Sequence, residues 1–114
     1  MSNIVRNLTR WRAGEAVGVS RKTRRIYQSD AFDIRVMPQQ KGHARILVVT
    51  SRKIGTAVKR NLFRRRIKSI FYEEKLYSKG FDWIVFGKKK GTEISFEDLK
   101  KIMLACSRAL SRES

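Results

Sequence analysis

The segment from Ser51 to Phe71 constrains the fold and the partners of this chain more than any other. Its residues 51–68 include eight Lys or Arg side chains and no carboxylate. Apolar residues also recur through it at helical spacing, which predicts an amphipathic helix over about 56–78. The apolar positions that we expect to dock on a core are Val58, Leu62, Phe63, Ile67 and Ile70.

The polar side of this predicted helix is uniformly basic. Arg60, Arg64 and Lys68 follow one another at i, i+4 and i+8, and Asn61 and Arg65 flank them. Like charges at this spacing repel by roughly 0.2–0.5 kcal/mol per pair. A face kept charged only for solubility normally mixes both signs. We therefore interpret the face as a binding surface for a polyanion.

The overall charge points to the same class of partner. The 114 residues include 27 Lys or Arg and 10 Asp or Glu, a net charge of +17, and nucleic acid is the usual partner of such a chain. We expect a single nucleic-acid-binding domain over 1–114. No run has the roughly 20 apolar residues of a membrane span, and one cysteine excludes an intramolecular disulfide. We expect a cytoplasmic protein with no membrane partner.

Four short segments have the composition of β-strands. Residues 32–36 alternate apolar and polar, which is typical of a half-buried strand. Residues 46–49 are continuously apolar, which predicts a central strand buried on both faces. A strand, the basic helix and then another strand predict a parallel βαβ unit. The four expected strands are 24–28, 32–36, 46–49 and 81–86.

Local signals predict the remaining elements. Apolar spacing predicts a short helix over 3–12, followed by a mobile connector over 13–22. Residues 38–42 have the length and polarity of a hairpin connection. Ser95, with Asp98 three residues later, is a capping signal for a last helix.

The residue types of an enzyme active site are nearly missing. His43 is the only histidine and falls in the expected hairpin connection, and Cys106 falls on the apolar side of the last helix. The loop Gly87–Gly91 is not a Walker motif, because no Ser or Thr follows Lys88. That loop is either a lysine cluster that contacts phosphate or a solvated turn. We expect the chain to bind a nucleic acid and to supply no catalytic residue and no metal ligand.

The nucleic acid could be DNA or RNA. No helix-turn-helix that would read a DNA groove is visible, whereas a sheet flanked by basic helices fits unpaired bases, which stack on aromatic side chains. Phe32 lies on an expected strand and has two open interpretations, as a stacking platform for RNA or as a core residue.

Residues 51–68 resemble the signature of the bacterial ribonuclease P protein subunit. The signature reads Ser-basic-Lys-x-Gly-x-Ala-Val-x-Arg-Asn-x-x-basic-Arg-x-x-basic, and every specified position is filled. The resemblance extends from about Phe32 to the C-terminus and leaves residues 1–30 as a divergent segment. It implies an α+β two-layer sandwich, in the order α-β-β-β-α-β-α, with a left-handed βαβ crossover.

The resemblance also implies a function and a set of site residues. Members of the family bind a large catalytic RNA, which uses Mg²⁺ to remove the 5′ leader of precursor tRNA. By this likeness, we expect a monomer in a 1:1 ribonucleoprotein, with the leader bound near Phe32, Ile34 and Val36. The implied RNA-facing residues are Arg52, Lys53, Lys59, Arg60, Asn61, Arg64, Arg65 and Lys68. The alternative is a structural RNA-binding protein of ribosomal type; a nuclease that acts without RNA is disfavoured.

Overall fold

A computed structural model describes residues 23–39 and 42–112 of the chain. The expected helix over 3–12 and the connector over 13–22 lie outside these residues. The described elements, in which η marks a 3₁₀ turn, are β1 Arg24–Gln28, β2 Phe32–Pro38, β3 Ile46–Val49, η1 Arg52–Ile54, α3 Ala57–Glu73, η2 Leu76–Lys79, β4 Phe81–Gly87, η3 Lys89–Thr92 and α4 Phe96–Ser111.

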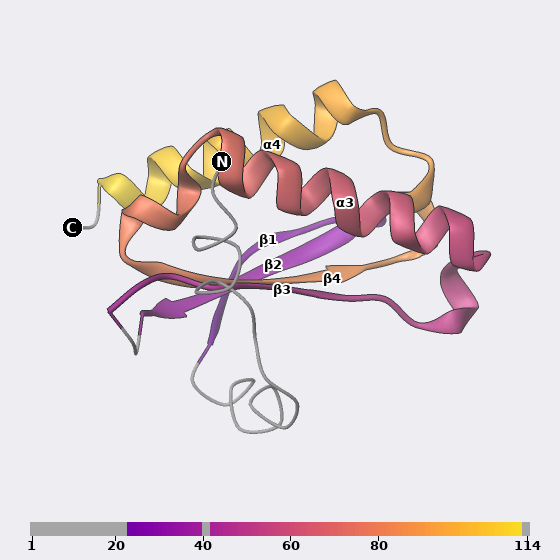
Figure 1. Ribbon diagram of the computed structural model, residues 1–114, viewed down its shortest axis with the longest axis horizontal. Helices are drawn as coiled ribbons and strands as arrows, with labels where there is room; N and C mark the ends of the chain where they lie inside the picture. Colours follow the sequence, from indigo (N-terminus) through magenta and orange to yellow (C-terminus); the bar gives the residue numbers. More distant parts are fainter. Residues whose placement is uncertain (1–22, 40–41, 113–114) are drawn as a thin grey trace.

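The four strands form one sheet in the order β1-β2-β4-β3. Strand β2 is antiparallel to both β1 and β4, and β3 is parallel to β4. Helices α3 and α4 both lie against the same face of the sheet (Figure 1). The described part is therefore the two-layer α+β sandwich that the sequence predicts, with α3 joining two parallel neighbouring strands.

The core lies between the sheet and the two helices. Phe32, Ile34 and Val36 alternate along β2 toward this layer, and each is fully buried. Their neighbours across the β2–β4 ladder include Val85 and Trp83, which are also fully buried. Burying one such side chain stabilises the fold by roughly 1.5–3 kcal/mol, so this layer holds the helices to the sheet.

The prediction that β3 is a central strand buried on both faces is wrong. The strand lies at the edge of the sheet, because β4 inserts between β2 and β3. The segment from Pro38 to Gly42 therefore does not connect a hairpin of paired strands. The face of β3 turned away from the helices is only partly covered, and Val49 on it is 38% exposed. A short apolar run indicates a strand but does not show how many of its faces are buried.

Helix α3 is confirmed, but its apolar arc is narrower than predicted. Phe63, Ile67 and Ile70 are buried, whereas Val58 is 75% and Leu62 36% exposed. At about 100° per residue, Leu62 lies about 100° and Val58 about 140° around the helix from Phe63. Both therefore fall outside the face that contacts the sheet.

The ends of the helices follow local signals. Thr56 caps α3 by accepting a hydrogen bond from the Lys59 backbone N–H, and Ser95 caps α4 in the predicted way by accepting one from Asp98. The α-helix ends at Glu73, earlier than predicted. The left-handed Gly80 closes η2 instead, with φ of 85°.

A buried ion pair, which sequence patterns did not reveal, joins the start of β3 to β4. The Asp82 carboxylate accepts a hydrogen bond from the Arg45 backbone N–H at 2.8 Å and pairs with Arg45 Nη2 at 3.0 Å. Asp82 is fully buried and Arg45 is 3% exposed. Buried charges are tolerated only when they are paired, so this contact contributes to the placement of β3 beside β4.

Candidate nucleic-acid interface

The polar face of α3 is the candidate interface, and the fold holds it outward. The helix is anchored through its buried side chains, including Phe63, Ile67 and Phe71. No acidic residue lies in its first turn. The first carboxylate of the helix is Glu73 at its last position, so all charged side chains before it on the outward face of α3 are cationic.

The structure brings most of the predicted RNA-facing residues together on this helix. Among the three residues at i, i+4 and i+8, Lys68 is exposed, and Arg60 and Arg64 are half-buried. None of the three is buried, so this stripe faces away from the core, but Arg60 and Arg64 are less exposed than predicted. The other exposed residues of the predicted set are Lys53, Lys59, Asn61 and Arg65. Arg52 belongs to η1, but its side chain lies outside the described part of the structure.

Arg64 is held in place by neighbouring polar groups. Its Nη2 donates to Thr50 Oγ1 at 2.6 Å, and its Nη1 donates to Asn61 Oδ1 at 3.4 Å. Thr50 directly follows β3. A guanidinium has five N–H donors in a fixed fork, and these two contacts orient the fork while leaving other donors for a phosphate. Thr50 is a supporting residue that sequence reasoning missed, because no spacing rule connects it to Arg64.

An open hollow of about 560 Å³ lies along this face. The described residues that line it are Val58, Asn61, Arg64, Arg65 and Lys68. Three cations, an amide and an exposed apolar side chain thus meet in one place. Phosphate, sugar hydroxyls and apolar sugar carbons are all groups that such a lining can contact.

The structure contradicts a surface role for the expected leader-binding residues. Phe32, Ile34 and Val36 are each 0% exposed and face the helices. The ring centroid of Phe32 lies 5.2 Å from that of Tyr27 and 6.2 Å from that of Phe63. Of the two interpretations of Phe32, the structure supports the core residue. A one-residue shift along a strand exchanges its two faces, and the sequence pattern did not show which face the helices cover.

The other face of the sheet carries a different set of side chains. Asp33 and Phe86 are register partners on this face, as are Arg35 and Ile84. Arg35 is held by Thr23, to which its Nε donates at 2.7 Å. Phe86 is half-buried beside a small cluster around Ile84. The sheet therefore presents an arginine and an aromatic ring on the face opposite to α3 and α4.

Arg66 is a basic residue of α3 whose structural role could not be recognised from the sequence. It is half-buried, and its Nη1 donates to the Ile94 backbone carbonyl at 3.3 Å. It therefore ties α3 to the segment before α4 and belongs to the packing of the two helices more than to the outward face. Its position among three consecutive arginines gives no signal of this difference.

The described residues contain no group of three or more His, Cys, Asp or Glu side chains that could hold a metal ion. Within the same ranges, no helix is long and apolar enough to cross a membrane. His43 is half-buried just before β3. The geometry of the α3 face therefore offers contacts for a polyanion.

Cys106 has the environment of a core residue. It is 8% exposed on α4, and desolvation by burial raises the pKa of its thiol to about 11. The thiolate is the reactive species, and it forms a very small fraction of the thiol near neutral pH.

We expect the native protein to react slowly with a thiol reagent at pH 7.5, and the denatured protein to react quickly. The measurement compares both rates in one buffer, with free cysteine as the reference. Rapid labelling of the native state would contradict the buried position of Cys106.

Comparison with known proteins identifies the family. The family model for ribonuclease P matches residues 12–111. The ribonuclease P protein component of Aliivibrio fischeri is 33% identical over 87 residues, 75% of this chain and 74% of that protein. That of Streptococcus agalactiae serotype III is 27% identical over 73 residues, 64% of this chain and 67% of that protein.

Solved structures show the same fold. The ribonuclease P protein from Thermotoga maritima superposes with a TM-score of 0.72 at 25% identity, covering 90% of this chain and 96% of that one. The protein from Staphylococcus aureus gives a TM-score of 0.73 at 18% identity, with 88% and 92% covered. With the cationic α3 face and the signature over 51–68, these matches show that the chain belongs to the ribonuclease P protein family.

Proposed function

We propose that this protein binds the catalytic RNA of ribonuclease P through the outward face of α3 and assists removal of the 5′ leader from precursor tRNA. A ribonuclease P protein component is part of an endoribonuclease ribonucleoprotein. In our proposal, the RNA partner uses Mg²⁺ to hydrolyse the phosphodiester, and the protein supplies no catalytic side chain. The complex contains one protein and one RNA and acts in the cytoplasm.

The observation that carries this proposal is the charge of α3. Arg60, Arg64, Arg65 and Lys68 share a helix that has no carboxylate before Glu73. Their mutual repulsion is relieved when phosphates lie between them, and counterions released from the RNA favour binding further. Neutralising RNA phosphates also lowers repulsion between RNA strands, which reduces the Mg²⁺ concentration that assembly and cleavage require.

For the leader, we propose a site on the sheet face opposite to the helices. Arg35 can pair with a phosphate and Phe86 can stack on an unpaired base, and both lie on this face. Such stacking is worth about 1–3 kcal/mol per base. This proposal replaces Phe32, Ile34 and Val36, whose side chains face the core.

The deciding experiment compares cleavage of precursor tRNA by the protein alone, by a bacterial ribonuclease P RNA alone, and by both. At low Mg²⁺, we expect efficient cleavage only when both are present. Cleavage by the protein alone would reveal an independent nuclease. RNA binding without any stimulation of cleavage would favour a structural RNA-binding protein of ribosomal type and overturn the proposal.

Replacing Arg65 with glutamine is expected to weaken binding of the catalytic RNA about fourfold to sixfold at 0.15 M salt. The estimate assumes the loss of one phosphate contact, which also reduces the slope of log K against log salt by about 0.7–0.9. Arg65 is exposed, so the thermal unfolding midpoint should not change.

The matched control is Arg108→Gln, which removes the same charge from an exposed position on α4. We expect this variant to keep nearly wild-type affinity and salt slope. Equal losses in the two variants would mean that the RNA senses only net charge and that the α3 face has no special role.

A further inference from the structure

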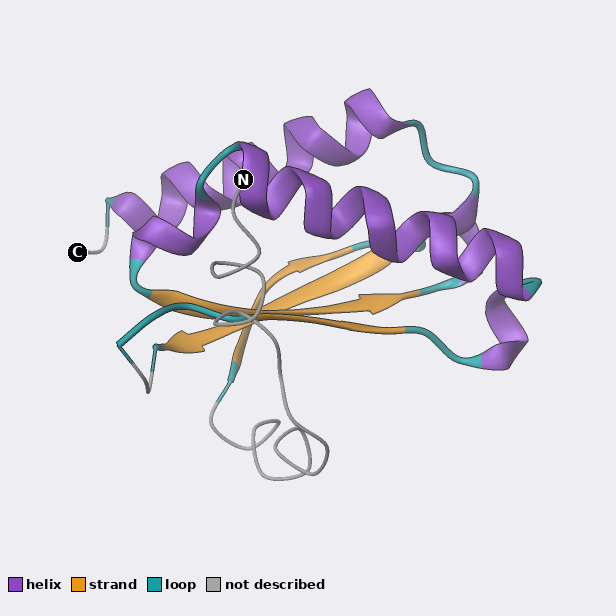
Figure 2. Ribbon diagram, in the orientation of Figure 1, coloured by secondary structure: helices purple, strands orange, loops and turns teal. Residues whose placement is uncertain are grey.

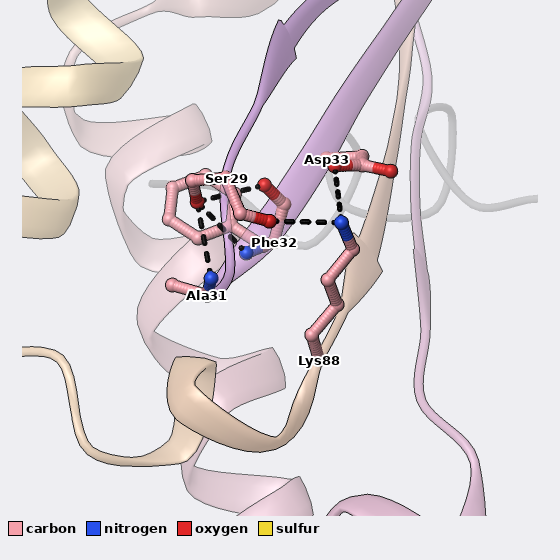
Figure 3. A network of polar contacts seen from close by, with 5 residues as sticks. All are labelled: Ser29, Ala31, Phe32, Asp33 and Lys88. Atoms are coloured by element: carbon pink, nitrogen blue, oxygen red, sulfur yellow. Dashed lines mark hydrogen bonds and ion pairs between the residues drawn. The ribbon is translucent and has the colours of Figure 1, made fainter.

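The loop between β4 and α4 holds three consecutive lysines in two different settings. The Lys88 side chain is 38% exposed and reaches back to β2, where its Nζ lies 2.9 Å from Asp33 Oδ1 and donates to the Ser29 carbonyl at 2.8 Å (Figure 3). Its backbone N–H also donates to the Ala31 carbonyl at 2.9 Å. Lys88 therefore fastens this loop to the turn between β1 and β2.

Close packing fixes the same loop after Lys88. Gly91 is buried, and a Cβ added there would collide with the Ala31 carbonyl oxygen and lie 3.2 Å from Phe63 Cε1. Gly91 also donates its N–H to the Lys88 carbonyl at 2.9 Å. Because both ends of the turn are held, the backbone that carries Lys89 and Lys90 is ordered before any ligand binds.

Lys89 and Lys90 point outward from this fixed turn, and both are exposed. Lys90 Nζ lies 3.5 Å from Asp30 Oδ2, but the two side chains are 69% and 86% exposed. Such exposed pairs stabilise a protein little, so an incoming phosphate can replace the Asp30 carboxylate. Two ammonium groups are thus available on an ordered backbone.

The loop also lies against the beginning of α3. Gly55, which lies just before α3, is close to the side chains of both Lys59 and Thr92. A Cβ built on Gly55 would be 3.6 Å from Lys59 Cβ and 3.7 Å from Thr92 Cγ2. Figure 2 shows the segment after β4 passing this end of the helix. Lys59 therefore lies where this loop meets α3, and Lys53 belongs to η1, which also contacts the loop; both lysines are exposed.

We infer that Lys89 and Lys90 bind phosphates of an RNA backbone and extend the RNA-binding surface of α3 onto the β4–α4 loop. This inference rests on the proposed function. It divides the three lysines by role: Lys88 positions the turn, and the two that follow contact RNA. The phosphates belong either to the catalytic RNA or to precursor tRNA, and the two share the same backbone chemistry.

The test uses the full chain with Lys89→Gln and Lys90→Gln together. The control carries Lys101→Gln and Arg108→Gln, which removes two charges from exposed positions on α4. In one arm, binding of each protein to a bacterial ribonuclease P RNA is measured across a salt series. In the other arm, precursor tRNA is titrated into the assembled complex of each protein with that RNA. A thermal melt of each variant verifies that the fold is intact.

We expect the loop variant to lose about 10- to 30-fold in affinity at 0.15 M salt in one of the two arms, with a salt slope shallower by about 1.4–1.8. The arm that shows the loss identifies the RNA whose phosphates the loop binds. The control should lose little, and both melting temperatures should match that of the wild type.

A loop variant that is indistinguishable from the control in both arms would overturn the inference while leaving the α3 interface in place. If the wild-type protein itself fails to bind the catalytic RNA, the proposed function fails instead. The two failures are therefore distinguishable in one set of titrations.

Discussion

Replacing Phe32 with alanine is expected to lower the free energy of unfolding by about 3–5 kcal/mol. The ring is fully buried between β2 and α3, beside Tyr27 and Phe63. Removing it deletes apolar contacts and leaves a cavity that the surrounding backbone fills only in part. Chemical denaturation followed by circular dichroism measures this change directly.

The same variant separates a core role from a leader-binding role. For the fraction of Phe32→Ala protein that is folded and assembled with RNA, the ratio of precursor to mature tRNA affinity should equal that of the wild type. Phe86→Ala is the matched comparison, because this half-buried ring lies on the opposite face of the sheet. We expect Phe86→Ala to lower that ratio by about 5- to 150-fold if one base stacks on the ring. If Phe32→Ala lowered the ratio of precursor to mature tRNA affinity without changing the stability, Phe32 would belong to the leader site.

Replacing Asp82 with alanine is expected to cost about 3–5 kcal/mol of stability, because it removes the buried carboxylate that pairs with the Arg45 guanidinium. The Arg45 side chain is 4% exposed, and its Nη2 lies 3.0 Å from Asp82 Oδ2. The Arg45 backbone N–H loses its 2.8 Å hydrogen bond to the same carboxylate. Urea unfolding at constant pH and salt measures the loss.

Asp30→Ala is the matched control for this prediction. Asp30 also pairs with a cation, Lys90, but its side chain is 86% exposed, so its removal should leave the urea midpoint nearly unchanged. A second variant, Asp82→Leu with Arg45→Met, removes both charges and should recover much of the lost stability. Equal midpoints for Asp82→Ala and the wild type would mean that the ion pair does not hold β3 beside β4.

Several features could be predicted from the sequence because their causes are local. The spacing of Phe63, Ile67 and Ile70 was sufficient for the long helix, and Ser95 with Asp98 for the start of the last one. The cationic face of α3 was also predictable, because residues four apart on a helix lie on one side whatever the helix packs against. The function followed from this face together with the family signature over 51–68.

Other features depend on contacts between distant segments, and only the tertiary structure decided them. The insertion of β4 beside β2 turned β3 into an edge strand, although its apolar sequence is typical of a central one. The placement of both helices on one face buried Phe32 and left Phe86 half-buried on the other. Alternation along a strand defines two faces but not which of them is covered.

The difference between neighbouring cations has the same origin. Lys88 and Lys89 are adjacent and chemically identical, yet one is anchored at Asp33 and the other faces solvent. Arg45 gains a buried partner 37 residues away in sequence. A sequence determines which charges a chain carries and along which helix face they lie. Which of them are neutralised inside the fold, and which remain free to bind RNA, depends on the packing of strands and loops that are far apart along the chain.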